Sequence, residues 1–226
     1  MDPLETTRRL AADLFPTALW VVLGGSVLTS ARTPASDLDV VVLLPDATPG
    51  APRRESIQYD GWPVELFVHD RASLAHYLAG DGRRPALHRM VALGTAALGD
   101  PADDQKAARE HLDAGPPPLG QAEKDSLRYA LTDLLDDLEH APPDEQAVIA
   151  TYTWIRTAEA MLHFRDHWVG TGKWLLRELR DLDPAYADRW LAARTSTAAI
   201  RDLAEQALTL AGGPLFAGYQ AAGERH

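Results

Sequence analysis

The stretch of sequence that decides the fold reads Leu23-Gly24-Gly25-Ser26 and, after residues 27–36, Asp37-Leu38-Asp39-Val40-Val41-Val42-Leu43-Leu44. The apolar run 18–23 predicts a β-strand that ends at the glycine pair, and the run 38–44 predicts a second strand. Side chains at positions i and i+2 of a strand point to the same face. Asp37 and Asp39 are therefore expected to project together, while the aliphatic side chains that alternate with them bury the opposite face.

Two neighbouring carboxylates on one strand repel each other, and a bound Mg²⁺ removes that conflict because it prefers hard oxygen ligands. A third acid, Glu65, lies inside the otherwise apolar run 62–68. A charged side chain in such a strand needs a partner, and the same metal site could supply one. We therefore predict that Asp37, Asp39 and Glu65 converge on a metal site.

The glycine pair is typical of a phosphate-binding turn. Gly24 and Gly25 let the backbone approach an anion closely, and Ser26 opens a short helix-like stretch, residues 27–31, with a hydroxyl that can add a hydrogen bond. Such a turn by itself most often only changes the chain direction. Its position before the two aspartates makes phosphate binding the favoured interpretation.

The remaining pattern predicts an α+β protein of two domains. The first, residues 1–114, holds a helix at 3–15 with an apolar stripe that includes Leu14, and a hairpin of strands 54–59 and 62–68 around Asp60-Gly61. Asp70 is the expected N-cap of a helix at 71–78. A proline-rich linker, 113–120, precedes a helical bundle, residues 121–226, with predicted helices at 121–140, 144–168, 172–181, 185–193 and 197–211. In the second of these helices Val148, Tyr152, Ile155 and Leu162 form the predicted apolar stripe.

Composition limits the classes of partner. The formal net charge is −11 and no basic stripe is visible, so nucleic acid is not the expected substrate, and a cationic small molecule suits the acidic surface. The chain has no cysteine, which excludes disulfides and thiolate metal sites. No apolar run reaches the roughly 18–20 residues of a membrane span, and no secretory signal is visible, so we expect a cytoplasmic protein that does not bind membranes. The oligomeric state is left open.

Residues 23–44 resemble the signature of the DNA polymerase β-like nucleotidyltransferase superfamily: a hydrophobic residue, Gly-Gly-Ser, about ten residues, and a hydrophobic-flanked Asp-x-Asp. Ser36, directly before Asp37, matches the common Ser-Asp-x-Asp form, and Glu65 lies where that family carries its third carboxylate. The resemblance implies a small mixed-sheet transferase domain and two Mg²⁺ ions held by Asp37, Asp39 and Glu65. It also implies that Ser26 and Ser36 help to position the phosphates of a nucleoside triphosphate.

The second half resembles, more weakly, the helical domain of aminoglycoside adenylyltransferases of the streptomycin/spectinomycin type. The residues that carry this resemblance are Thr153-Trp154-Ile155-Arg156 and Gly170-Thr171-Gly172-Lys173-Trp174. It implies ATP as the donor of AMP, Lys173 as a phosphate ligand, Glu65 as the general base and a small-molecule hydroxyl as the acceptor. Arg156, Glu159, Trp62 and Trp174 are candidates for the acceptor side.

Other interpretations stay open at the level of the sequence. Glu65 could protect an edge strand, Lys173 could be an ordinary first-turn lysine, and Glu159 could serve only as a structural partner of Arg156. The chain could also adenylylate a protein, as antitoxin-type relatives of the superfamily do, or it could be a non-catalytic nucleotide-binding module.

Overall fold

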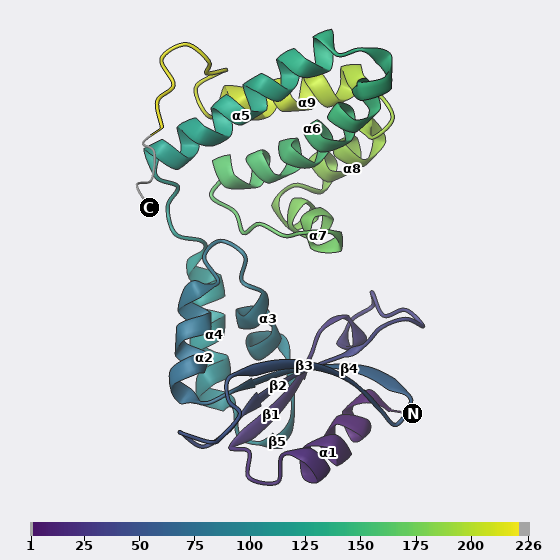
Figure 1. The fold of residues 1–226 in the computed structure, drawn as a ribbon, viewed down its shortest axis with the longest axis vertical. Coiled ribbons are helices and arrows are strands. Elements are labelled where there is room, and N and C mark those ends of the chain that lie inside the picture. Colours follow the sequence, from purple (N-terminus) through teal and green to yellow (C-terminus); the bar gives the residue numbers. More distant parts are fainter. Residues whose placement is uncertain (1, 222–226) are drawn as a thin grey trace. The chain divides into compact units, whose positions relative to one another are not determined.

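The computed structural model describes residues 2–221 and consists of two compact units that divide between Ala114 and Gly115 (Figure 1). The first unit combines a five-stranded mixed sheet with helices, and the second is entirely helical. This architecture confirms the predicted α+β fold class. Within residues 2–221, none of the helices is both long and apolar enough to cross a membrane.

The sheet has the strand order β3-β4-β2-β1-β5. Its strands are β1 (Trp20–Gly24), β2 (Leu38–Leu43), β3 (Arg53–Tyr59), β4 (Trp62–His69) and β5 (Thr95–Gly99). Strands β2 and β4 pair in parallel, and every other neighbouring pair is antiparallel. The helices of this unit are α1 (Pro3–Leu14), the 3₁₀ turn η1 (Ser26–Leu28), α2 (Arg71–Gly80), α3 (Ala86–Leu93) and α4 (Ala102–Ala114).

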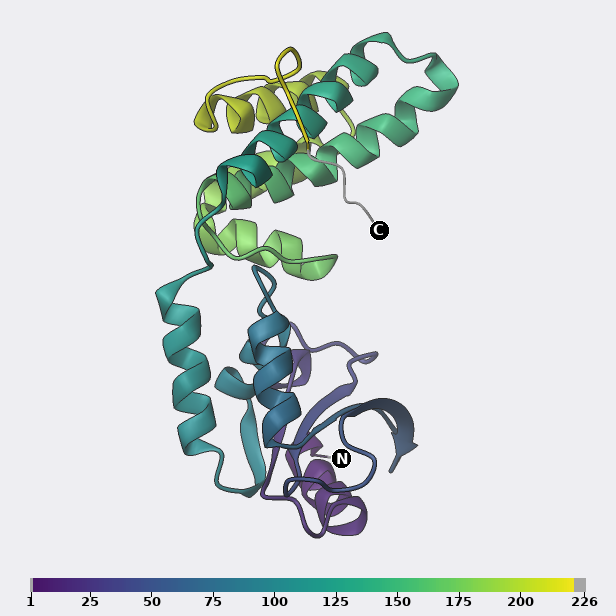
Figure 2. The same cartoon turned by 60° about the vertical axis from the view of Figure 1, so that its left-hand side comes forward.

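Helices cover both faces of the sheet (Figures 1 and 2). Helix α1 packs on one face, where Leu10 and Ala11 meet the alternate residues of the strands, such as Val40 and Leu66. The other face is covered by α2, α3 and α4, and its core contains Val41 and Leu43 together with residues from those helices. Beyond Asp39, strand β2 is therefore buried on both faces, as expected for a near-continuous aliphatic run in a central strand.

Local sequence signals set the boundaries of several elements as predicted. Asp60 and Gly61 connect β3 and β4 with positive φ angles of 49° and 77°, the backbone conformation that a primed two-residue hairpin turn requires. Asp70 caps α2, accepting a hydrogen bond from the Ser73 backbone N–H at 2.8 Å, and the Ser73 side chain completes a capping box.

The second unit consists of α5 (Gln121–His140), α6 (Pro143–Phe164), α7 (Lys173–Leu182), α8 (Pro184–Ala193) and α9 (Thr197–Leu210). One hydrophobic core collects side chains from all of them. Trp154 of α6 and Trp190 of α8 stack with ring centroids 4.0 Å apart, and each indole N–H donates to the backbone carbonyl of the other residue. This double hydrogen bond satisfies both indole donors in a part-buried position.

In four details the structure differs from what the sequence predicts. Strand β5 was not predicted, because Thr-Ala-Ala-Leu-Gly has little β propensity and forms an edge strand with no fully buried residue. Helix α6 ends at Phe164 rather than 168, and two residues of its predicted apolar stripe, Val148 and Tyr152, are 71% and 54% exposed. The helix buries Thr153 and residues 157–162, and of the predicted stripe Leu162 is fully buried and Ile155 packs against the core. Leu14, at the end of α1, is likewise 47% exposed.

Candidate active site

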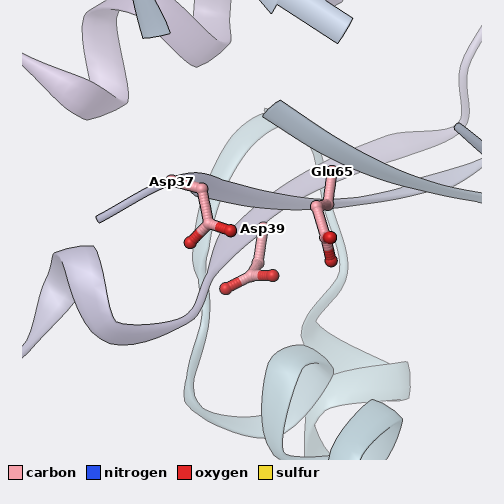
Figure 3. Close-up of side chains that lie close together, drawn as sticks. All are labelled: Asp37, Asp39 and Glu65. Atoms are coloured by element: carbon pink, nitrogen blue, oxygen red, sulfur yellow. The ribbon is translucent and has the colours of Figure 1, made fainter. Parts of the chain in front are cut away.

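Three carboxylates meet at one end of the parallel strand pair. Asp37 directly precedes β2, Asp39 lies in β2, and the parallel register places Glu65 of β4 opposite Asp39. One ligand oxygen from each side chain lies within 4.8 Å of the others, and all three residues are half-buried (Figure 3). Unit charges of one sign at such distances repel, by several kcal/mol at about 4 Å under a protein-like dielectric.

This donor set fits a divalent cation. Three carboxylate oxygens converge from two adjacent strands, and hard cations such as Mg²⁺ take oxygen ligands from carboxylates and substrate phosphates. Among residues 2–221, no other group of three or more acids, histidines or cysteines is arranged to hold a metal ion.

The glycine turn lies directly against Asp39. Gly25 has φ 78° and ψ −170°, a region of backbone conformation that is essentially restricted to glycine. A Cβ atom at this position would lie 2.8 Å from Cγ of Asp39 and would collide with its Oδ2. The preceding residue, Gly24, pairs with Asp39 in the β1–β2 register. Both glycines of the turn are thus adjacent to the carboxylates, and only a residue without a side chain fits at position 25.

Ser26 and Ser36 are buried and hold the loop between β1 and β2. Their hydroxyl oxygens lie 3.3 Å apart, and Ser36 Oγ accepts a hydrogen bond from the Thr33 backbone N–H at 2.9 Å. The two serines therefore connect the turn after β1 to the residue before Asp37. Their predicted contacts with phosphate stay predictions.

Glu65 has a partner that the sequence analysis did not identify. The Arg54 guanidinium donates to Glu65 Oε2 at 2.8 Å and lies over the Phe67 ring, 4.9 Å from its centroid. The sequence did contain a signal for this contact. A two-residue turn at Asp60-Gly61 fixes the hairpin register, in which Arg54 pairs with Phe67, the next residue along β4 on the same face as Glu65.

Trp62 does not lie near the carboxylates. It lies three positions before Glu65 in β4, so its side chain projects from the opposite face of the sheet and packs against the core on the α1 face. The Arg32 guanidinium lies 5.3 Å from its ring centroid. The structure therefore places Trp62 on the opposite side of the sheet from the three acids.

The other predicted residues belong to the helical unit. Lys173 is the exposed first residue of α7, and the next residue, Trp174, has the Arg177 guanidinium 4.6 Å from its ring centroid. Arg156 and Glu159 form an ion pair one helical turn apart on α6, and Glu159 is 8% exposed. A structural role for Glu159 thus has a direct observation behind it. The predicted contacts of Lys173, Trp174 and Arg156 with substrates stay predictions.

Comparison with known proteins finds a likeness among solved structures but none in sequence. No protein-family model matches the chain, and no curated protein sequence matches it. Among solved structures, it is similar to a nucleotidyltransferase-like protein from Exiguobacterium sibiricum 255-15, with 13% sequence identity and a TM-score of 0.47. The similarity covers 92% of this chain and 77% of the other. The chemistry of the site rests on the residues described above.

Proposed function

We propose that the chain is a Mg²⁺-dependent nucleotidyltransferase that transfers AMP from ATP to a hydroxyl group of a small molecule. The observation that carries this proposal is the convergence of Asp37, Asp39 and Glu65 within 4.8 Å, beside a glycine turn whose backbone touches Asp39. The three acids can hold metal ions, and the glycine turn can accommodate the phosphates of the nucleotide.

Each acid has a distinct task in this proposal. Asp37 and Asp39 hold the metal, and Glu65 accepts the proton of the acceptor hydroxyl or completes a second metal site. When bound, Mg²⁺ would neutralise charge on the triphosphate and on the pyrophosphate that leaves. Arg54 bonds Glu65, and its side chain is 64% exposed. It can therefore rotate towards solvent when Glu65 binds the metal ion or the acceptor hydroxyl.

The glycine turn positions the donor. Gly24 and Gly25 let the triphosphate approach the edge of the sheet, and Ser26 begins the short turn η1 beside it. Lys173 is proposed to add a positive charge to the same phosphates. The helix dipole slightly destabilises a positive charge in the first turn of a helix, and an anionic ligand beside Lys173 would offset this cost.

The test is nucleotide binding and transfer by Asp39→Asn. MgATP is expected to raise the melting temperature of the unaltered chain, and this variant, which removes one ligand charge from the site, should abolish that rise. It should also lower transfer by at least about a hundredfold, the usual scale for losing a group of the catalytic centre. The matched control is Asp60→Asn in the hairpin turn, where Asn-Gly suits the turn equally well and nucleotide binding should persist.

Labelled ATP identifies the acceptor class. After incubation of the chain with ATP labelled in the α-phosphate and a cell extract, label on low-molecular-weight compounds is the expected result. Label on protein would favour the protein-adenylylating alternative. An absence of nucleotide binding at saturating Mg²⁺ would leave the non-catalytic alternative and contradict the proposal.

A further inference from the structure

A cavity of about 290 Å³ lies in the first unit, and its lining includes Arg54, the hydrogen-bond partner of Glu65. It lies among β3, β4, α2 and α3 and the loop before β3, and its lining includes Arg54, Phe67, His69, Tyr77, Leu87 and Met90. Phe67 and His69 follow Glu65 at alternate positions of β4, so all three project from the same face of the sheet. Arg54 lines the cavity and also bonds Glu65, so one side chain connects the cavity to the proposed catalytic base.

The order of the strands places the cavity relative to the candidate site. Across the sheet, the glycine turn ends β1, Asp39 lies in β2, Glu65 lies in β4, and the cavity is lined by residues of β4 and β3. An in-line transfer places the leaving phosphates and the acceptor on opposite sides of the reacting phosphorus. With the phosphates at the glycine turn, the side beyond Glu65 belongs to the acceptor.

The lining sets the chemistry of an occupant. Phe67, Leu87 and Met90 give the cavity an apolar wall. Its volume lies just below the roughly 300–1,000 Å³ of ligand pockets, so the cavity suits one ring rather than a multi-ring sugar. Three charged residues line the cavity, and each already has a partner; Arg53 bonds Glu55 and the Gly50 carbonyl. Arg54 bonds Glu65, and Asp81 accepts hydrogen bonds from the Leu87 backbone N–H at 3.1 Å and lies 2.9 Å from His88 Nδ1.

One buried polar atom in the lining residues lacks a partner. His69 is 6% exposed, and its Nδ1 has no hydrogen-bond partner in the described part of the chain. Burial lowers the pKa of His69, so the ring is neutral at pH 7 and has one nitrogen that can accept a hydrogen bond. A hydroxyl group on an occupant could donate to it.

We propose that this cavity is the acceptor subsite and that the acceptor is an uncharged, hydroxylated compound with one apolar, ring-sized group. The inference rests on the proposed function for the assignment of the acceptor hydroxyl to Glu65. It replaces the cationic small molecule that the net charge suggested, because the cavity presents an apolar wall and two guanidinium groups, and its one acid, Asp81, already has hydrogen-bond partners.

Methionine methyl groups provide a local readout. The chain has three methionines, Met1, Met90 and Met161, of which Met90 lines the cavity and Met161 is buried in the core of the helical unit. The full chain, labelled with ¹³C at its methionine methyls, is titrated with 2-phenylethanol, cyclohexylmethanol, glycerol and streptomycin. The two ring alcohols should shift the Met90 signal saturably and leave Met161 unchanged, and glycerol and streptomycin should shift neither.

A matched pair of variants locates the binding. Ala86→Phe adds a ring at an exposed alanine that lines the cavity, and it should raise the Kd of the ring alcohols by about tenfold or more. Ala107→Phe makes the same change at an exposed alanine of α4 outside the lining and should leave the Kd unchanged. Because the titration of the unaltered chain is a separate measurement, the test holds even if Ala86→Phe folds poorly.

The outcomes separate the two proposals. A Met90 signal that neither ring alcohol moves, or that glycerol or streptomycin moves as strongly, overturns the subsite. An unchanged Kd in folded Ala86→Phe overturns it as well. If the ring alcohols bind as expected but MgATP does not bind, the cavity stands as a ligand site and the nucleotidyltransferase proposal fails.

Discussion

At the scale of single residues, the contact between Gly25 and Asp39 connects the phosphate turn to the metal-binding acids. The backbone at Gly25 adopts a conformation restricted to glycine, and a Cβ would collide with the Asp39 carboxylate. We therefore expect Gly25→Ala to destabilise the chain by about 1–3 kcal/mol from the backbone alone, and by more once Asp39 is displaced. Metal-dependent nucleotide binding should be lost with it, as measured by melting temperature with and without MgATP.

The control for this prediction is Gly61→Ala in the hairpin turn. Gly61 has nearly the same φ, 77° against 78°, but a Cβ there would meet nothing within 4 Å. Its substitution should cost about 1–2 kcal/mol and leave MgATP binding unchanged. Equal effects of the two substitutions on nucleotide binding would show that the contact with Asp39 is unimportant.

His69 makes the stability of the first unit depend on pH. Burial lowers its pKa below the ordinary value of about 6.5, and the nearby Asp70 only partly opposes this effect. The unfolded chain then binds a proton more readily than the folded one, so the contribution of His69 is complete above about pH 6.5 and is lost as the pH falls towards the folded pKa. Urea unfolding at pH 7.5 and 5.5 should show a smaller loss of stability in His69→Phe than in the unaltered chain. The same loss in both would exclude His69 as the cause.

At the scale of secondary-structure elements, the β3–β4 hairpin delivers both Glu65 and its partner. Arg54 and Glu65 form an exposed ion pair at 2.8 Å, and such pairs contribute at most about 1 kcal/mol. A metal ion must compete with this pair for Glu65. Arg54→Leu should therefore tighten Mn²⁺ binding, by no more than about fivefold, in isothermal titration.

The adjacent residue is a suitable control for that substitution. Arg53 bonds Glu55 and the Gly50 carbonyl, and its guanidinium lies 5.7 Å from the Phe15 ring centroid, on the α1 side of the sheet. Arg53→Leu removes the same charge from the same strand without touching Glu65, so Mn²⁺ affinity should stay unchanged. If both substitutions tightened binding equally, general electrostatics rather than the Arg54–Glu65 contact would be responsible.

At the scale of the whole molecule, each unit has its own hydrophobic core. Two cores flank the sheet in the first unit, and a third lies among α5 to α9. The connection at 115–120 has no helix or strand. We therefore expect a fragment of residues 1–118 to fold alone, with a cooperative urea transition followed by circular dichroism, and to bind Mn²⁺ through its three acids. A fragment without a cooperative transition would show that the first unit depends on the second.

The elements that the sequence predicts correctly are those whose formation depends on neighbouring residues. The strands around the glycine pair, the hairpin at Asp60-Gly61 and the cap at Asp70 depend on near neighbours, and the structure has all of them. Strand β5 was missed because its residues have no strand preference of their own and form a strand only by pairing with β1. The apolar stripe predicted for α6 holds at Ile155 and Leu162 but fails at Val148 and Tyr152, because helix packing, and not hydrophobicity alone, selects the buried face.

The sequence by itself determined the chemistry of the candidate site: which acids it holds, that Asp37 and Asp39 point together, and that glycines precede them. Spacing along one strand fixes these properties, because side-chain direction alternates residue by residue. Only the tertiary structure decided that β2 and β4 run in parallel, which brings Glu65 beside Asp39. It also decided that α2 and α3 leave a cavity lined by Arg54, the partner of Glu65. Strand pairing and helix placement depend on the packing of segments far apart in the chain, and no local pattern specifies them.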